Sequence, residues 1–263
     1  MNPKRIFAIF LRQLFLLKRG SRLINIFYWS SIDLILWGFI TVYLNSVGGS
    51  SLNFMTVMLG AVILWNFLFR VQYGVTVSFL EDSWARNFMN LFSSPLSTSE
   101  YVSGLILTSI FNGLASLVTA VIIARLIFSY SIFQLGIAVL PFIVILFIFG
   151  WAIGLFATAV VMRLGPSAEV FAWSFPALFT PFSSVFYPIY ALPQALQPIA
   201  NALPTAHVFE GMRSVILAGS FDSSRLFLAL GLALFYFVLS YAFLLWSYRA
   251  VLRKGLFTRF YTD

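Results

Sequence analysis

Six apolar stretches account for most of this chain, and each approaches or exceeds the roughly 20 residues that a helix needs to cross the hydrocarbon core of a bilayer. They cover residues 23–44, 53–80, 101–128, 133–162, 170–187 and 226–248. Backbone groups in lipid must satisfy their hydrogen bonds internally, and the strict alternation of a β-barrel is absent, so these stretches are expected to be helices. The sequence therefore predicts an all-α membrane protein, in which residues 1–263 form a single transmembrane domain with six transmembrane helices.

The composition excludes the common soluble classes. Hydrophobic residues make up 61% of the chain and charged residues 9%, against roughly 45–50% and 25% in a soluble domain. Such a chain lacks the polar surface of a soluble enzyme or of a nucleic-acid-binding protein. The absence of cysteine excludes disulfides, and a single histidine offers no candidate metal site.

The basic residues predict the orientation, because Lys and Arg accumulate on the cytoplasmic side of membrane proteins. With both termini cytoplasmic, only Arg213 and Arg225 fall outside, while Arg70 and Arg125 lie within spans. The other basic residues are then all cytoplasmic: Lys4, Arg5, Arg12, Lys18, Arg19, Arg22, Arg86, Arg163, Arg249, Arg253, Lys254 and Arg259. The net charge of +8 therefore marks the inner leaflet rather than a nucleic-acid site.

Residues 3–20 have the pattern of an amphipathic helix. Arg5, Arg12 and Arg19 recur every seven residues on one stripe, and apolar residues cover much of the remaining surface. Such a helix is expected to lie along the inner leaflet with its cations toward anionic lipid. A positive leader that only orients the first span is the alternative.

The longest cytoplasmic connection runs over residues 81–100, and its segment 81–96 also predicts a short amphipathic helix. Asp82 or Ser83 can cap its start, and Pro95 bounds its end. Four apolar residues share one face at helical spacing, namely Trp84, Phe88, Leu91 and Phe92, and Arg86, Asn87 and Asn90 occupy another. The apolar face could dock into a groove on a cytosolic partner or rest on the lipid interface, and the spacing alone leaves both open.

A proline-rich region, residues 176–204, begins within the fifth apolar stretch, so that stretch is expected to end in broken helical pieces. Its prolines are Pro176, Pro181, Pro188, Pro193, Pro198 and Pro204. Irregular backbone at membrane depth persists only where it is buried in protein or lines a cavity. Residues 188–222 are therefore expected to form a re-entrant or capping element on the outer side.

Asp33 and Arg70 lie inside predicted spans, where charged side chains are costly and mark candidate functional residues. Counting along the helices places the two at similar depth, and Asn66 lies one turn from Arg70. The two charges are expected to pair, or to share a polar network with Asn66. A direct role in the movement of a substrate or proton is the alternative.

Five phenylalanines fall on one stripe if the fifth span stays regular: Phe171, Phe175, Phe179, Phe182 and Phe186. Such an aromatic face could line a substrate pathway. Packing against a neighbouring helix or lipid explains the same stripe, and the 31 phenylalanines of the chain favour packing.

The organisation of the chain resembles the permease subunit of type-2 ABC transporters, a class of exporter, and the likeness extends over nearly the whole chain. Residues 3–20 are similar to that family's amphipathic connecting helix, and residues 81–96 to its ATPase-coupling helix. The most specific likeness is the proline-rich run 182–219, with the outer motif Pro204, His207, Glu210 and Arg213.

The resemblance implies that two copies of the chain form the conduit, with the second and fifth helices facing the pathway. It also implies two copies of a cytosolic ATPase subunit that bind ATP and Mg²⁺, so that this chain is non-catalytic and carries no cofactor. The implied ATPase-coupling residues are Glu81, Trp84, Arg86, Phe88, Leu91, Phe92 and Arg163. The implied substrates are drugs, lipids or lipid-linked oligosaccharides, and the implied location is the cytoplasmic membrane of a bacterium or archaeon.

An ion-coupled secondary transporter or channel is the main alternative, in which Asp33 and Arg70 would relay ions or protons. Residues 81–96 argue against it, because such a protein has no need of a coupling helix. An intramembrane enzyme would require a convergent catalytic set, which the sequence lacks. The phosphate-binding motif of an ATPase is also missing, so the energy for transport is expected to come from a partner.

Overall fold

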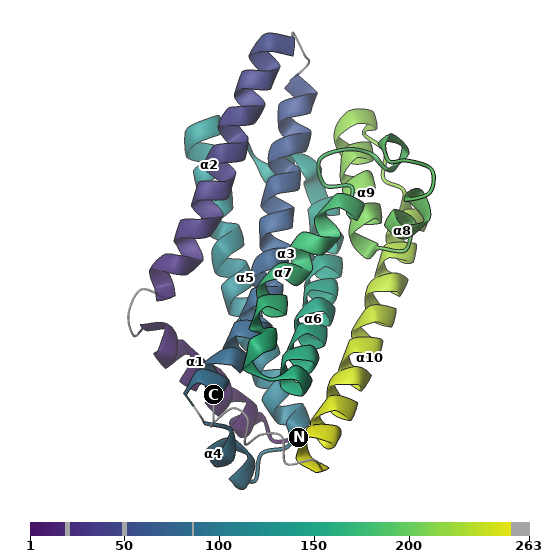
Figure 1. The fold of residues 1–263 in the computed structure, drawn as a ribbon. Helices are drawn as coiled ribbons and strands as arrows, with labels where there is room; N and C mark the ends of the chain where they lie inside the picture. The colour runs from purple at the N-terminus through teal and green to yellow at the C-terminus, as the bar shows by residue number, and fades with distance from the viewer. Residues whose placement is uncertain (19–21, 49–51, 86, 254–263) are drawn as a thin grey trace.

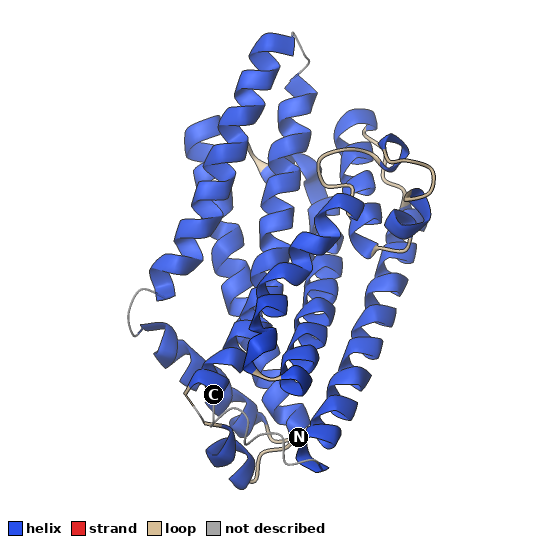
Figure 2. Cartoon of the chain, viewed as in Figure 1, coloured by secondary structure: helices blue, strands red, loops and turns tan. Residues whose placement is uncertain are grey.

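The computed structural model describes residues 1–18, 22–48, 52–85 and 87–253 (Figure 1). Across these residues the chain is built from helices and connecting turns and contains no strand (Figure 2), which confirms the all-α prediction. The α-helices are α1 Pro3–Lys18, α2 Arg22–Gly48, α3 Leu52–Trp84, α4 Phe88–Ser93, α5 Thr98–Phe128, α6 Val139–Leu164, α7 Glu169–Phe179, α8 Gln197–Asn201, α9 Pro204–Ala218 and α10 Ser223–Arg253. The 3₁₀ turns are η1 Ile132–Ala138, η2 Pro166–Ala168, η3 Thr180–Phe182 and η4 Ile189–Ala191.

Five helical segments of the described chain are long and apolar enough to cross a membrane: Phe27–Val47, Phe54–Trp84, Thr98–Phe128, Ile132–Leu164 and Ser223–Arg253. The predicted fifth span at 170–187 differs, because α7 has only 11 residues and reaches about 16 Å at 1.5 Å per residue. Pro176 within α7 and Pro181 just after it remove backbone donors. The described residues thus contain five full-length spans rather than the six expected.

α3 lies at the centre of the bundle and packs against α2, α5, α6, α7 and α9. In its most apolar window 78% of the residues are buried, against 22% for α2 and for α10. Small residues permit this close packing. A Cβ built on Gly74 would lie 2.7 Å from the Cα of Ser109 in α5, and one on Gly154 of α6 would lie 2.9 Å from the Cβ of Val75.

The bundle has two distinct ends (Figure 1). α1 and α4 lie at one end, together with the end of α3, the start of α5 and the end of α10; we call it the α4 end. α8 and α9 lie toward the opposite end, the α9 end. α1 therefore begins at the same end of the molecule at which α10 finishes.

Local signals determine where the long helices start and stop. Ser97 and Glu100 form a capping box at the start of α5: Ser97 Oγ accepts from the Glu100 amide at 3.2 Å, and Glu100 Oε2 accepts from the Ser97 amide at 3.0 Å. α6 stops at Gly165 and α9 at Gly219, with φ of 88° and 62°, a region of backbone space that glycine enters without strain.

The helix predicted over 3–20 is present as α1, but the one predicted over 81–96 is shorter than expected. α3 continues to Trp84, so Asp82 and Ser83 lie inside α3 and do not cap a new helix. α4 begins only at Phe88, and Asn87 at its N-cap makes no side-chain capping bond. The longer α3 follows from the burial of Asp82, whose carboxylate is hydrogen-bonded to side chains of α1 and α5.

Candidate functional site

A cavity of about 540 Å³ lies between α2, α3 and the region of α7; we call it the α2–α3–α7 cavity. Its walls combine aromatic rings with polar side chains: Trp29, Asp33, Trp37, Trp65, Asn66, Phe69, Arg70, Gln72, Tyr73, Trp173, Thr180 and Phe186. Trp29, Asp33 and Trp37 share one face of α2, since residues four apart are neighbours on a helix. An aromatic wall with a few polar groups is typical of a small-molecule site.

Asp33 and Arg70 both line this cavity, but no ion pair joins them among the described residues. Arg70 Nε instead donates to Ser30 Oγ at 3.1 Å, and its guanidinium lies 5.6 Å from the centre of the Tyr73 ring. Ser30 Oγ in turn lies 2.6 Å from Ser116 Oγ of α5. The structure shows no direct contact between the two charges in the described residues, whereas Asn66 lines the same cavity as both, so the pairing or shared polar network stays a prediction.

The expected phenylalanine stripe does not form one face, because α7 ends at Phe179. Phe186 lines the α2–α3–α7 cavity and stacks on Trp37 with a ring distance of 4.4 Å. Phe175 and Phe179 instead contact Phe156 and Phe149 of α6, Phe182 packs against the core, and Phe171 is exposed. Packing thus explains three of these rings.

The four tryptophans are among the cavity residues that the sequence analysis did not predict. The pattern Trp29, Asp33 and Trp37 was readable, because a charge flanked by aromatic residues one turn away on each side occupies a single helix face. Trp65 and Trp173 carried no such signal, since only the tertiary packing of α3 and α7 brings them to the same wall.

At the α4 end, α1 is held to the bundle by polar contacts. Arg12 Nη2 donates to Asp82 Oδ2 at 2.7 Å, and the Tyr101 hydroxyl donates to the same oxygen at 2.7 Å. Arg5 donates to the Pro95 carbonyl and lies 3.6 Å from the Glu100 carboxylate. These contacts tie α1 to the end of α3, to the start of α5 and to the segment that follows α4.

The predicted coupling residues do not form an exposed apolar face. Phe88 and Leu91 are buried in the chain's own core, with the Phe88 ring 5.1 Å from that of Phe79. This corrects the expected docking face: a short helix with one apolar side buries that side against α3 and α5. Arg86 and the side chain of Phe92 lie outside the described residues.

The remaining predicted coupling residues contact neighbouring helices. Trp84 is half-exposed, and its Nε1 donates to Glu169 Oε1 at the start of α7 at 2.8 Å. Arg163, in the last turn of α6, packs against α10, with its guanidinium carbon 3.4 Å from the centre of the Trp246 ring. Glu81 is partly buried on the last turns of α3.

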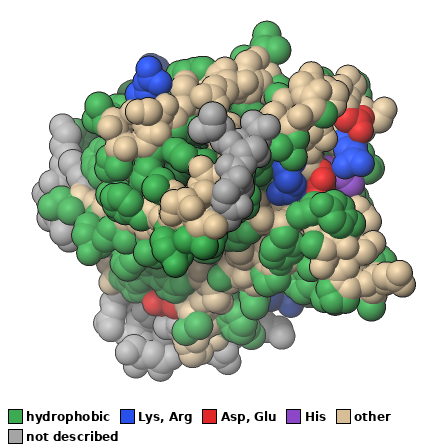
Figure 3. All heavy atoms as spheres, turned by 90° about the horizontal axis from the view of Figure 1, so that it is seen from above, with side chains coloured by type: hydrophobic (Ala, Val, Ile, Leu, Met, Phe, Trp, Pro, Cys, Tyr) green, Lys and Arg blue, Asp and Glu red, His purple; other side chains and the backbone are tan. Residues whose placement is uncertain are grey.

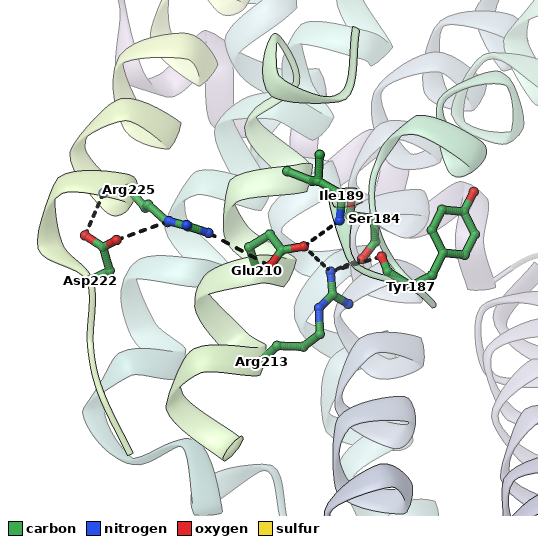
Figure 4. Close-up of polar contacts among 7 residues, drawn as sticks. All are labelled: Ser184, Tyr187, Ile189, Glu210, Arg213, Asp222 and Arg225. Carbon is green, nitrogen blue, oxygen red and sulfur yellow. Dashed lines mark hydrogen bonds and ion pairs between the residues drawn. The ribbon is translucent and has the colours of Figure 1, made fainter. Parts of the chain in front are cut away.

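At the α9 end, the predicted outer motif fastens the irregular segment that follows α7 (Figure 4). Arg213 Nη2 donates to the carbonyls of Ser184 and Tyr187 at 2.6 and 3.2 Å. Glu210 Oε1 accepts from the Ile189 amide at 2.8 Å and from Arg213 Nη2 at 3.1 Å. We call Ser184, Tyr187, Ile189, Glu210, Arg213, Asp222 and Arg225 the α9 cluster.

The other two motif residues, Pro204 and His207, also stabilise the local backbone. Pro204 occupies the first turn of α9, where its missing amide proton is not needed. A ring nitrogen of His207 lies 2.8 Å from the Asn201 carbonyl. Seen from this end, charged side chains gather at a few points on a surface that is otherwise hydrophobic or neutral (Figure 3). Glu210 and Arg213 make structural contacts, which include an i, i+3 ion pair with each other.

A family model for the ABC-2 type transporter matches residues 4–217, which is most of the chain. The chain belongs to the ABC-2 type transporter family. A comparison with curated proteins finds no match.

Family membership makes this chain the membrane permease of a transporter, as the sequence indicated. ABC-2 permeases are generally non-catalytic membrane subunits. The matched range extends from α1 into α9, and so includes the α2–α3–α7 cavity, the contacts of α1 with Asp82, and the Glu210–Arg213 motif.

Proposed function

We propose that this ABC-2 permease is the membrane half of an ATP-driven exporter and works as a homodimer. Two copies of a separate cytosolic ATPase subunit would bind ATP and Mg²⁺ and supply the energy. The family match over residues 4–217 is the observation that carries this proposal. It favours a driven exporter over the ion-coupled transporter in which Asp33 and Arg70 would relay ions.

The α4 end is proposed to face the cytoplasm of a bacterial or archaeal cell. The excess of basic residues in segments at this end supports that orientation. α1 lies across this end of the bundle (Figure 1), buries Ile9 and exposes Phe7, Leu11 and Phe15. An exposed apolar face beside cationic residues suits the inner-leaflet interface.

The ATPase is proposed to contact the exposed edge of α4 rather than its apolar face. Asn90, Ser93 and Pro95 are exposed there, whereas Phe88 and Leu91 anchor α4 against α3 and α5. Ser167, in the short turn between α6 and α7, is a second exposed point at the same end. A push on α4 would pass through its buried side chains into α3, which lines the α2–α3–α7 cavity.

The α2–α3–α7 cavity is proposed as the part of the pathway that receives the substrate. Its aromatic rings offer apolar and stacking surface, while Asp33, Asn66 and Arg70 offer hydrogen-bonding and charged groups. That mixture suits an amphipathic molecule such as a drug, a lipid or a lipid-linked oligosaccharide. In a homodimer, two such cavities would supply the lining of one conduit.

Affinity purification from native membranes in mild detergent tests the partner. We expect an ATPase to co-purify, and Asn90→Arg with Ser93→Arg to reduce its yield about tenfold, as the loss of one or two interface contacts would. Ser220→Arg, exposed at the α9 end, is the matched control and should leave the yield unchanged. Equal ATPase yields from both variants would refute the proposal that the ATPase contacts the exposed edge of α4.

Transport by the chain alone tests the energy source. Reconstituted in vesicles without an ATPase, the permease should accumulate no solute. Accumulation driven by an ion gradient, and abolished by Asp33→Asn, would overturn the proposal in favour of ion-coupled transport.

A further inference from the structure

A second, strongly apolar hollow lies on the side of the bundle away from α2. It has a volume of about 400 Å³ and runs between α6 and α10; we call it the α6–α10 groove. Its lining includes Phe149, Phe156, Tyr236, Leu239 and Phe243. The Tyr236 hydroxyl is bonded to the Ala202 carbonyl at 3.2 Å, which leaves the Ser240 hydroxyl as the other polar side-chain group along the walls.

The groove has the dimensions of a lipid acyl chain. If a methylene occupies about 30 Å³, as a water molecule does, the groove has room for roughly a dozen methylenes. The step of seven residues from Tyr236 to Phe243 gives it a length of about 10 Å along α10. α10 is one of the least buried spans, with 22% of its central window buried, and exposes Phe235 and Val238. The groove therefore opens on a helix that faces lipid.

A guanidinium lies at the α4 end of this groove. Phe243 lines the groove, and its ring centre is 5.8 Å from the guanidinium carbon of Arg163, which also lies 3.4 Å from the centre of the Trp246 ring. The Arg163 side chain is partly exposed and makes no ion pair within the described part of the chain, although its Nε is buried without a hydrogen-bond partner. The stacked cation is thus available to an anion from outside the chain.

Two further cations extend this charge along α10. Arg249 and Arg253 lie three and seven residues after Trp246, on the same side of the helix, and both are exposed. Of the four carboxylates described at this end, Asp82 and Glu100 are engaged by Arg12 and Arg5 and Glu169 by Trp84, and Glu81 is partly buried. A second copy of this chain would therefore bring little negative charge to this surface.

We propose that the α6–α10 groove binds one anionic phospholipid. An acyl chain fills the groove, and the phosphate binds Arg163, with Arg249 and Arg253 close to the headgroup. Basic pockets between transmembrane helices on the cytoplasmic side bind such headgroups, and Trp246 lies at the level where tryptophan marks the membrane interface. This site is separate from the α2–α3–α7 cavity and requires no ATPase.

Photolabelling of the full-length permease in nanodiscs tests the site. The probe is a phosphatidylglycerol with a diazirine in its acyl chain, and labelled peptides are located by mass spectrometry. Labels are expected within residues 149–156 and 236–243. Excess unlabelled phosphatidylglycerol should compete about fivefold better than phosphatidylcholine, as expected from the attraction between one basic residue and an anionic lipid.

Arg163→Gln should reduce labelling about tenfold, because it removes a charge-assisted contact to the phosphate. Arg125 is exposed in the last turn of α5, away from the α4 end. Arg125→Gln is therefore the matched control and should be labelled like the wild type. If Arg163→Gln lowers the melting temperature in detergent by itself, the double variant Arg249→Gln, Arg253→Gln replaces it and should reduce labelling about fivefold.

Three outcomes would overturn the proposal. Equal competition by phosphatidylglycerol and phosphatidylcholine would show that the labelling comes from ordinary annular lipid. Full labelling in both arginine variants would exclude the headgroup contact. Crosslinks between α10 helices of two chains would identify a second copy as the occupant. Because labelling is measured without nucleotide, loss of the proposed ATPase partner leaves all three readouts unchanged.

Discussion

The two ends of this permease are both fastened by arginine, but in different ways. At the α4 end, Arg12 bonds the carboxylate of Asp82 and so joins two regular helices, α1 and α3. At the α9 end, Arg213 donates to three backbone carbonyls, those of Ser184, Val185 and Tyr187. At the α4 end, the arginine joins two regular helices that satisfy their own backbone hydrogen bonds. At the α9 end, it supplies hydrogen bonds that the irregular segment after α7 does not make within itself.

The difference follows from the prolines. Regular helices satisfy their own backbone groups, so a side chain at the α4 end only needs to set how helices pack. The segment after α7 leaves helical geometry, and Ser184 adopts the left-handed region with φ of 53°, which is strained for a residue other than glycine. Its carbonyls and amides no longer bond within a helix, and buried ones need other donors and acceptors, which Arg213 and Glu210 of α9 supply.

Arg213→Ala should have the largest effect on stability. It removes the donor for three carbonyls and leaves the Glu210 carboxylate, only 15% exposed, without this partner, at a cost of about 3–5 kcal/mol. Thermal unfolding in detergent, followed by tryptophan fluorescence, measures the loss. Arg225→Ala is the matched control: its side chain is 48% exposed, so about 0–1 kcal/mol is expected. Similar losses of stability in the two variants would mean that the contacts of Arg213 contribute no more than an exposed ion pair does.

Asp82→Ala should cost less, about 2–3 kcal/mol. It removes the acceptor of Arg12 and of the Tyr101 hydroxyl, but Arg12 is 28% exposed and can turn to water. The double-mutant cycle of Arg12→Ala with Asp82→Ala should show a coupling of about 1–3 kcal/mol. Strict additivity would mean that the observed contact does not hold α1 to α3.

Gly104→Ala tests the packing of α1 on α5. A Cβ there would lie 2.5 Å from Cγ2 of Ile9, so α1 must move, at a cost of about 1–3 kcal/mol. Gly231→Ala in α10 meets nothing within 4 Å and should stabilise by about 0.5–1 kcal/mol. The same unfolding assay compares the two. If Gly104→Ala were neutral, α1 would be free to rest on lipid without docking on α5.

Trp84→Phe should have the smallest effect, about 0.5 kcal/mol, the low end for a single hydrogen bond. It removes the Nε1 donor to Glu169 at a half-exposed site that joins α3 to α7. Glu169→Gln keeps an acceptor and should behave like the wild type in the same assay. A loss above about 1.5 kcal/mol would mean that this exposed contact fastens the helices as firmly as the buried contacts of the α9 end.

Much of the fold was readable from the sequence because lipid imposes a simple rule. Long apolar runs must become helices, and four of the six predicted spans are found as full-length helices close to the expected bounds, with a fifth at 133–162 formed by η1 and α6. The span at 170–187 is regular only as far as Phe179, and the expected break follows, with Pro176 in the last turn of α7 and Pro181 just after it. Asp33 and Arg70 were identified by charge alone, yet their partners were not.

The sequence by itself determined the class of this protein, the positions of its five long spans and its membership of the ABC-2 family, because apolar length and local motifs act within single segments. Only the tertiary structure decided which groups meet: Arg70 with Ser30, Arg12 with Asp82, Arg213 with the backbone after α7. It also turned Phe88 and Leu91 inward. Such contacts depend on the relative rotation and depth of packed helices, and helical periodicity identifies an apolar face without identifying what that face will contact.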